Sequence, residues 1–260
     1  MKNNTVQLVA SDIDGTLLQG GAQEISPEIF AQIRRLRRHG IRFCAASGRQ
    51  YTSLRRLFAP VADDISYVCE NGAIVYHEGR VLFKLGFARA DAERLIGEIL
   101  AQSDCEVMIS GANTCYLMPK SEEYLAMMTR HSGNHIRVVQ NTGEVDEQII
   151  KISAYCRGPG GAAAREVPLG APWKDKCNVA VAGERWLDFT ESDKGRGLSA
   201  LCGALGVDMR RVAAFGDNYN DLPMLRRVGW PYLMAGGVTP AQARLSAPVA
   251  SRVQQVLAAL

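Results

Sequence analysis

Two aspartates stand at the end of a short apolar run near the start of the chain. Residues 6–10 predict a β-strand, and Asp12-Ile13-Asp14-Gly15-Thr16 follows almost directly. Because side chains two residues apart on extended backbone lie on the same side, both carboxylates leave the carboxyl end of this strand together. One acid could then attack an electrophile while the other moves a proton. An acidic turn that only caps the strand would show the same residues, so other segments have to decide.

Three further apolar runs also end in polar residues. Residues 41–46 lead into Ser47-Gly48-Arg49, residues 65–69 into Glu70-Asn71-Gly72, and residues 212–215 into Gly216-Asp217-Asn218-Tyr219-Asn220-Asp221. In open parallel sheets, ligands bind beyond the carboxyl ends of the strands. We therefore expect the polar side chains of these four segments to converge on one crevice.

Three of the converging acids need a counter-charge. Asp12, Asp14 and Asp217 would repel one another and raise each other's pKa unless a cation neutralised them. An oxygen-rich site with few carboxylates suits Mg²⁺, which keeps several waters and binds through one or two acids and a substrate phosphate. Lys194, at the expected start of a helix, adds a positive charge, and Ser47 with Gly48 supplies a hydroxyl and a backbone N–H. Together these groups predict a pocket for a phosphoryl group.

The elements that carry these residues form two similar stretches. Up to about residue 76, apolar runs alternate with amphipathic helix patterns, which predicts βαβ units and a parallel sheet. The first helix should begin at Ser26-Pro27-Glu28 and end at Gly40. The pattern returns from about residue 188, where a helix begins at Asp193-Lys194 and ends near Gly206.

The residues between these stretches follow a different pattern. Short runs of alternating polarity at 105–109, 136–139 and 149–155 lie among helix patterns at 90–102 and 121–131. This pattern is typical of an antiparallel sheet with one exposed face, backed by helices. The sequence therefore predicts an α/β fold, with a Rossmann-like parallel-sheet core formed by residues 1–85 and 188–260 and an inserted α/β cap domain at 86–187.

Composition argues against several other classes of protein. A chain of 260 residues that is 47% hydrophobic can bury one large core or two smaller ones. The net charge of +3 is mild, and the basic run 34–38 fits the solvated face of a helix, so we expect no nucleic-acid partner. No apolar stretch approaches about 18 residues, and we expect neither a membrane span nor a removable signal peptide.

The seven cysteines indicate the compartment. They are odd in number and contain no Cys-x-x-Cys pair, so neither a disulfide framework nor a zinc ribbon is predicted. A reducing cytoplasm is the expected location.

Four motifs resemble those of the haloacid dehalogenase superfamily in their usual order. They are Asp12-Ile13-Asp14-Gly15-Thr16, Ser47-Gly48-Arg49, Lys194-Gly195, and Gly216-Asp217 through Asn220-Asp221. Ala46-Ser47-Gly48-Arg49, Glu70-Asn71-Gly72 and a large insertion between the second and third motifs are similar to the Cof-type sugar-phosphate phosphatases of that superfamily. The chain departs from that type at Leu233-Met234-Ala235-Gly236-Gly237, where relatives usually carry Ala-Met-Gly-Asn-Ala; this change bears on the edge of the pocket.

The resemblance implies the catalytic and metal-binding residues. Asp12 would attack phosphorus and form an aspartyl phosphate. Asp14 would protonate the leaving alcohol and then deprotonate the water that releases phosphate. Mg²⁺ would bind the Asp12 carboxylate, the Asp14 backbone carbonyl and Asp217.

The resemblance also implies how the phosphoryl group is held. Ser47, the Gly48 N–H, Lys194 and Asn220 would bind its oxygens, where charge builds up in the transition state. Asp221 would orient Lys194 or a water on the metal. Asn71 would lie near the substrate, and whether it touches the substrate stays open.

The implied function is magnesium-dependent hydrolysis of small phosphate monoesters. Sugar phosphates are the expected substrates, with nucleotides and pyridoxal phosphate as alternatives. A phosphomutase and a non-catalytic sensor of phosphorylated metabolites are the other candidates. Asp14 argues against the sensor, because binding alone needs no proton transfer, and the insertion at 86–187 is larger than the usual mutase cap. A monomer or a homodimer is expected.

Overall fold

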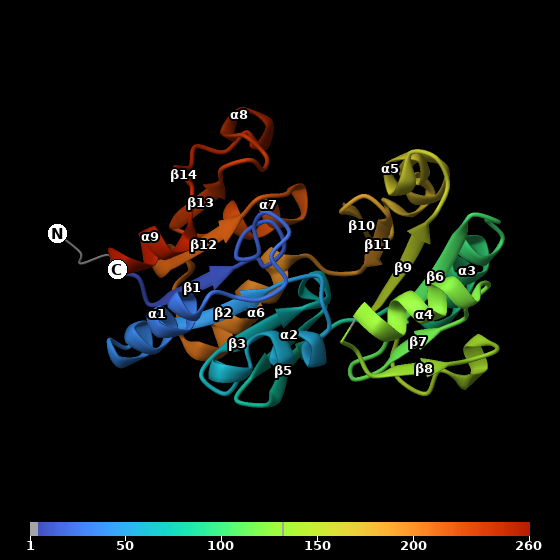
Figure 1. Cartoon of the computed structure of the whole chain (residues 1–260), viewed down its shortest axis with the longest axis horizontal. Coiled ribbons are helices and arrows are strands. Elements are labelled where there is room, and N and C mark those ends of the chain that lie inside the picture. Colours follow the sequence, from blue (N-terminus) through green and yellow to red (C-terminus); the bar gives the residue numbers. More distant parts are fainter. Residues whose placement is uncertain (1–4, 132) are drawn as a thin grey trace. The chain divides into compact units, whose positions relative to one another are not determined.

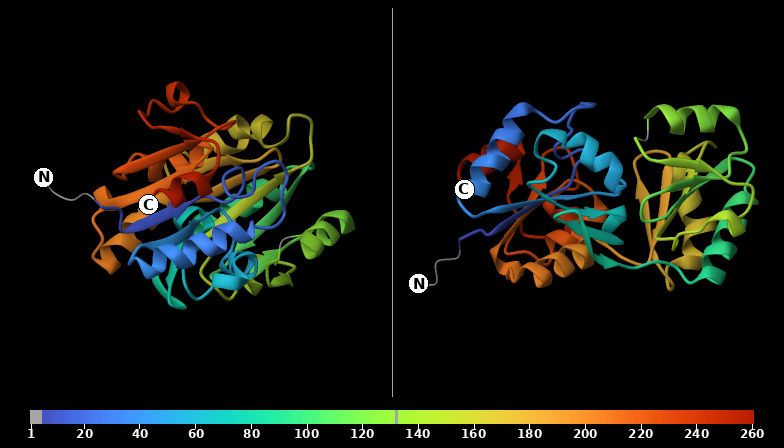
Figure 2. Two further views of the ribbon diagram at one scale, coloured as in Figure 1. Left: turned by 60° about the vertical axis from the view of Figure 1, so that its left-hand side comes forward. Right: turned by 90° about the horizontal axis from the view of Figure 1, so that it is seen from below.

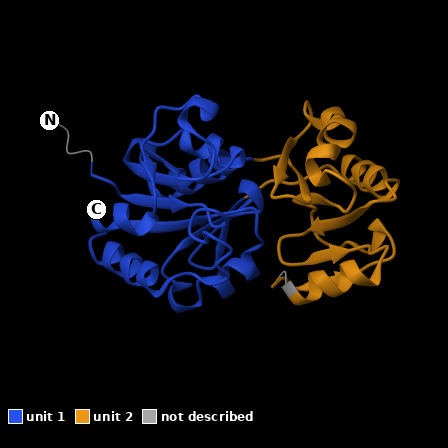
Figure 3. Cartoon of the chain, turned by 45° about the horizontal axis from the view of Figure 1, so that its top comes forward, with its two compact units in different colours: residues 1–83, 193–260 blue, residues 84–192 orange. Residues whose placement is uncertain are grey.

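The computed structural model describes residues 5–131 and 133–260 and divides the chain into two compact units (Figure 1, Figure 3). Unit 1 comprises Met1–Phe83 and Asp193–Leu260, and unit 2 comprises Lys84–Ser192. The boundaries predicted after residues 85 and 187 differ slightly from these, which follow residues 83 and 192.

Unit 1 is built on an eight-stranded sheet of order β14-β13-β12-β1-β2-β3-β4-β5. The six strands from β14 to β3 pair in parallel, and β4 pairs antiparallel with β3. This confirms the predicted Rossmann-like core and adds an antiparallel edge that the sequence pattern did not indicate. The strands are β1 (Leu8–Ser11), β2 (Arg42–Ala46), β3 (Ser66–Cys69), β4 (Ile74–His77), β5 (Arg80–Lys84), β12 (Val212–Gly216), β13 (Trp230–Met234) and β14 (Val249–Ala250).

Helices cover both faces of the unit 1 sheet (Figure 2). The helix α1 begins after Ser26, whose side chain accepts a hydrogen bond from the Glu28 N–H, and it buries Ile29, Ile33 and Leu36 against the sheet. The predicted start of this helix is therefore confirmed. The helices of the unit are α1 (Pro27–Arg38), α2 (Tyr51–Leu57), α6 (Lys194–Leu205), α7 (Leu222–Leu225), α8 (Pro240–Ala243) and α9 (Val253–Ala258).

The helix α6 places a lysine at the sheet edge. It begins and ends where the sequence predicts. Asp193 caps it by accepting a hydrogen bond from the Arg196 N–H at 2.8 Å, and Gly206 ends it in the left-handed conformation. Its own residues Leu198, Leu201 and Cys202 are buried. Lys194 therefore lies in the first turn of a helix that is fixed at both ends and along one face.

Unit 2 is built on a six-stranded sheet of order β10-β11-β9-β6-β7-β8. The pairings are antiparallel, except that β8 runs parallel to β7. The strands are β6 (Cys105–Ser110), β7 (Cys115–Leu117), β8 (Ile136–Val138), β9 (Lys151–Cys156), β10 (Asn178–Ala182) and β11 (Trp186–Thr190), and the helices are α3 (Arg89–Leu100), α4 (Glu122–His131) and α5 (Gly161–Arg165).

Two further findings concern the predicted location. Among the described residues, no helix combines the length and apolar character needed to cross a bilayer. The seven cysteines, all among the described residues, are buried and form no disulfide. The cytoplasm stays a prediction, as does the oligomeric state.

Candidate active site

Asp12 follows β1 directly at the carboxyl edge of the unit 1 sheet. Its N–H donates to the carbonyl of Phe215 in β12 at 3.0 Å, and its own carbonyl accepts a hydrogen bond from the Ser11 hydroxyl at 2.8 Å. The residue is only 5% exposed. Because β1 lies between β2 and β12, the backbone that carries this carboxylate is held from both sides.

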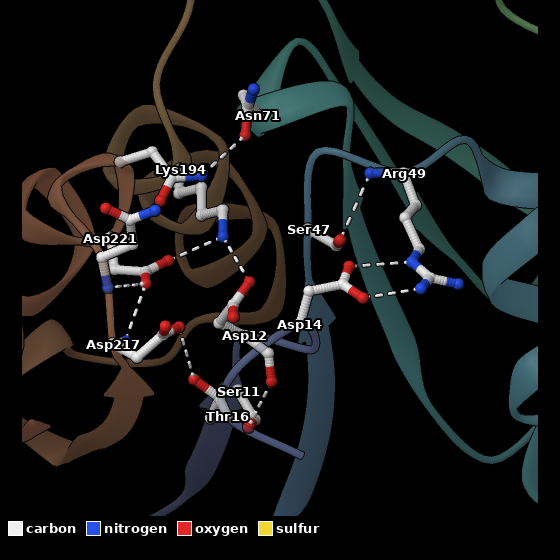
Figure 4. A network of polar contacts seen from close by, with 12 residues as sticks. Ser11, Asp12, Asp14, Thr16, Ser47, Arg49, Asn71, Lys194, Asp217 and Asp221 are labelled. Atoms are coloured by element: carbon white, nitrogen blue, oxygen red, sulfur yellow. Dashed lines mark hydrogen bonds and ion pairs between the residues drawn. The ribbon is translucent and has the colours of Figure 1, made fainter. Parts of the chain in front are cut away.

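Lys194 joins this carboxylate to the loop after β12. Its ammonium donates to Asp12 Oδ1 and to Asp221 Oδ1, both at 2.6 Å, and its side chain is 1% exposed. The second oxygen of Asp221 accepts the N–H groups of Asp217 and Asn218, both at 3.0 Å. Both oxygens of Asp221 are thus engaged within the protein (Figure 4).

Asp217 lies against the turn that follows Asp12. The Thr16 hydroxyl donates to Asp217 Oδ1 at 3.1 Å. Gly15 has a φ of 88°, and a Cβ placed on it would come within 2.2 Å of Asp217 Oδ2. The positive φ and the close approach of the carboxylate both require glycine at this position.

Three acids therefore gather around one ammonium. Carboxylate oxygens of Asp12, Asp217 and Asp221 lie within 4.8 Å of one another. Burial and the neighbouring charge of Asp221 raise the pKa of Asp12 well above its usual range, and the same two causes raise the pKa of Asp217. Burial alone would lower the pKa of Lys194, but the charges of Asp12 and Asp221 outweigh it and raise that pKa. The cluster thus contains three carboxyl groups and only one ammonium to neutralise them.

This set of oxygens fits a hard divalent cation. Carboxylates that are too close together favour a positive ion between them, and oxygen is the ligand that Mg²⁺ prefers. Since Asp221 is engaged on both oxygens, Asp12 and Asp217 are the carboxylates suited to hold such an ion.

Asp14 turns toward a different partner. The Arg49 guanidinium donates to both of its oxygens, from Nε at 2.9 Å and from Nη2 at 2.6 Å. This hydrogen bonding raises the pKa of Arg49. The Asp14 side chain is 57% exposed, in contrast to the buried cluster around Asp12.

The loops after β2, β3 and β12 are tied together beside this pair. The Ser47 hydroxyl accepts the Arg49 N–H at 3.2 Å, and the Ser47 carbonyl accepts the Asn71 N–H at 3.0 Å. Asn220 donates its side-chain amide to Asn71 Oδ1 at 3.3 Å. A Cβ on Gly48 would lie 3.0 Å from the same Asn71 oxygen, so this loop packs directly on Asn71.

The structure brings the predicted residues together in two neighbouring groups. One group contains Asp12, Lys194, Asp217 and Asp221, and the other contains Asp14 and Ser47 (Figure 4). Gly48 and Asn220 adjoin the second group through their contacts with Asn71. Sequence reasoning gave no role to Thr16 or Arg49, although both belong to the motifs. The available signal was a hydroxyl two residues after Asp14 and a cation two residues after Ser47.

The arrangement can support nucleophilic chemistry at a phosphate. A buried carboxylate on a fixed backbone lies beside an ammonium that can neutralise an anion. An exposed carboxylate two residues later, bonded to Arg49, is a candidate for passing a proton to a leaving group.

Comparisons with known proteins identify the family of this chain. Residues 9–254 match the haloacid dehalogenase-like hydrolase family. The 5-amino-6-(5-phospho-D-ribitylamino)uracil phosphatase of Escherichia coli (strain K12) is 27% identical over 250 residues, covering 94% of this chain and 91% of that protein. The HMP-PP phosphatase of Citrobacter koseri is 25% identical over 237 residues, covering 89% and 85%.

Solved structures show the same fold. The haloacid dehalogenase subclass IIB sugar phosphatase BT4131 superposes with a TM-score of 0.83 over 98% of both chains, at 16% identity. At this identity the likeness shows the fold.

Proposed function

The chain belongs to the haloacid dehalogenase-like hydrolase family, and on this basis we propose that it hydrolyses small phosphate monoesters through a phosphoaspartyl intermediate on Asp12, with Mg²⁺ as cofactor. The observation that supports this most directly is the Asp12 carboxylate, buried at the end of β1 and bonded to Lys194 at 2.6 Å. A nucleophile and its charge-neutralising partner are thereby in contact.

The reaction has two displacement steps at phosphorus. In the first, an oxygen of Asp12 forms a bond to phosphorus while the bond to the ester oxygen breaks, and Asp14 gives its proton to the leaving alcohol. In the second, Asp14 takes a proton from a water that attacks the same phosphorus. Phosphate leaves and the Asp12 carboxylate is restored.

The remaining residues bind the phosphoryl oxygens. Lys194 keeps its charge because two acids raise its pKa, so it can neutralise an anion at the end of β1. The Ser47 hydroxyl, the Gly48 N–H and the Asn220 amide are donors in the neighbouring loops. Asp221 holds Lys194 and the backbone of Asp217.

The metal would be held by Asp12, Asp217 and the backbone carbonyl of Asp14. When bound, Mg²⁺ supplies positive charge that offsets the acid cluster and the phosphate.

We expect Gly15→Ala to weaken Mg²⁺ binding. The new methyl group meets Asp217 Oδ2 at 2.2 Å and the residue has a φ of 88°, so either the turn or the carboxylate has to move. A loss of about tenfold in Mg²⁺ affinity, equal to about 1.4 kcal/mol, is expected. Isothermal calorimetry with Mg²⁺ alone measures it without relying on activity.

Gly203→Ala is the matched control for this variant. Gly203 lies within α6, and a Cβ there meets no atom within 4 Å. Alanine in a helix interior is tolerated or stabilising, so Mg²⁺ affinity should be unchanged. Equal affinities for the two variants would contradict the placement of the metal beside Gly15.

The substrates are proposed from chemistry shared with the relatives. By their names, the E. coli protein is a phosphatase of 5-amino-6-(5-phospho-D-ribitylamino)uracil and the C. koseri protein is a phosphatase of HMP-PP. We propose a small phosphorylated metabolite for this chain, with sugar phosphates first among the candidates.

A phosphate-release screen tests the function. About a hundred phosphate esters would be assayed with Mg²⁺ and with a chelator in its place. Release of phosphate that requires Mg²⁺ supports the proposal. Tight binding of one ester with no release from any would favour the sensor, and transfer of phosphate to an added sugar would favour the mutase.

A further inference from the structure

Arg49 holds the proton-transfer residue apart from the other acids. Its guanidinium faces the Asp14 carboxylate side by side, with one hydrogen bond to each oxygen (Figure 4). Two parallel hydrogen bonds fix the plane of a carboxylate as well as its position. The side-chain torsions of Asp14 are therefore set by Arg49.

The backbone of Arg49 is held in place by hydrogen bonds on both of its polar groups. The Arg49 N–H donates to the Ser47 hydroxyl at 3.2 Å, and its carbonyl accepts the Glu70 N–H at 3.2 Å. Two loops at the sheet edge thus anchor the residue that holds Asp14. The position of Asp14 is coupled to the same segment that carries the phosphate-binding Ser47.

This contact affects charge as well as geometry. Asp12, Asp217 and Asp221 already lie close together, with one ammonium bonded to two of them, and a fourth carboxylate among them would add repulsion. The Asp14–Arg49 pair is also partly exposed, with side-chain exposures of 57% and 35%, so solvent screens the attraction and the pair can open. Asp14 is held firmly enough to be oriented and weakly enough to move onto a leaving group.

We propose that Arg49 is a positioning residue that orients Asp14 for proton transfer and acts on the reaction through Asp14 alone. The inference rests on the proposed function, because it takes Asp14 as the group that protonates the leaving alcohol.

Leaving groups of different basicity test this role. Glycerol 2-phosphate releases a basic alkoxide that needs a proton, whereas p-nitrophenyl phosphate releases a phenolate that leaves without one. In Arg49→Gln, we expect kcat/KM for glycerol 2-phosphate to fall by about 30-fold or more, as misplacing a general acid does. For p-nitrophenyl phosphate, kcat/KM should stay within about threefold, because that ratio covers only the steps up to release of the phenol.

The second chemical step gives an independent readout. Asp14 also activates the water, so hydrolysis of the phosphoenzyme should be slow in Arg49→Gln. A rapid burst of one p-nitrophenol per enzyme, followed by slow turnover, is expected. Arg49→Lys keeps the charge but loses the paired hydrogen bonds, and it should lie between Gln and the wild type.

Two companion variants separate the outcomes. Arg56→Gln, an exposed position in the helix α2 that follows Arg49, should leave both substrates unaffected. Asp14→Asn should show the same selectivity as Arg49→Gln, and adding Arg49→Gln to it should cause no further loss with glycerol 2-phosphate.

An equal fall in kcat/KM for both substrates would overturn the proposal, since Arg49 would then bind the phosphoryl group itself. Unchanged kinetics in Arg49→Gln would overturn it as well. If the wild type released no phosphate from either ester, or if Asp14→Asn lacked the selectivity, the proposed function would be the part that fails.

Discussion

Asp12→Asn should abolish phosphate release while leaving the fold intact. An amide oxygen is a poor nucleophile toward phosphorus, so no phosphoenzyme forms and turnover should fall by more than about a thousandfold. The amide keeps an oxygen that can accept the Lys194 hydrogen bond. Burial also raises the pKa of Asp12, so a neutral side chain suits this position. The folded structure should therefore persist.

Three measurements check this expectation. Phosphate release gives the rate, intact mass after quenching with substrate detects phosphoenzyme, and thermal melting reports the fold. Asp63→Asn is a suitable control, because that carboxylate is 87% exposed and pairs with Arg55. Activity of Asp12→Asn within about tenfold of the wild type would contradict the mechanism.

Local signals predicted much of the unit 1 core. Ser26 and Gly206 mark helix ends through hydrogen bonds and backbone conformations that depend on neighbouring residues. The strands β1, β2, β3 and β12 are buried from both sides, so they appear as continuous apolar runs. These features are encoded over a few residues.

The edge of the sheet could not be predicted in the same way. The strand β5 is largely exposed, with Val81 at 49% exposure, and it shows no alternation of apolar and polar residues. Its place depends on the hairpin through Glu78 and Gly79, which both have positive φ. The turn at Asn71, with a φ of 53°, similarly reverses the chain from β3 into β4. Antiparallel pairing here is set by turn geometry.

The site residues also divide into those that nearby sequence indicates and those that depend on distant parts of the chain. Asp221 bonds backbone N–H groups three and four residues earlier and lies three residues after the capping Asn218, a spacing that sequence alone could have indicated. The contact between Asp12 and Lys194 joins residues 182 apart, and only the rule for strand ends and the family motifs suggested it. The orientation of Asp14 toward Arg49 depends on side-chain torsions that no spacing specifies.

Lys194→Met should remove both activity and a large part of the stability. The ammonium is the shared donor of two buried acids, so its loss leaves Asp12 and Asp221 without their partner. Breaking a buried ion pair on one side costs about 3–5 kcal/mol. Activity should fall by more than about a thousandfold, because the neutralising charge beside the nucleophile is lost. Lys174→Met, at an exposed pair with Glu166, is the control and should change neither property.

The pH dependence of this destabilisation distinguishes charge from packing. Removing the ammonium raises further the folded-state pKa of Asp12, which burial and Asp221 already raise. The folded variant then binds more protons than the unfolded chain at pH values between the two pKa values, so its stability is lost as pH rises through that window. We therefore expect the difference in unfolding free energy between wild type and Lys194→Met to be larger at pH 7 than at pH 5, measured by urea denaturation at both.

Adding Asp221→Asn should recover part of the stability and none of the activity, because it removes one of the unpaired acids without restoring a cation. If the difference in unfolding free energy were independent of pH and the double variant recovered no stability, Lys194 would contribute through packing. The electrostatic role assigned to this lysine would then be contradicted.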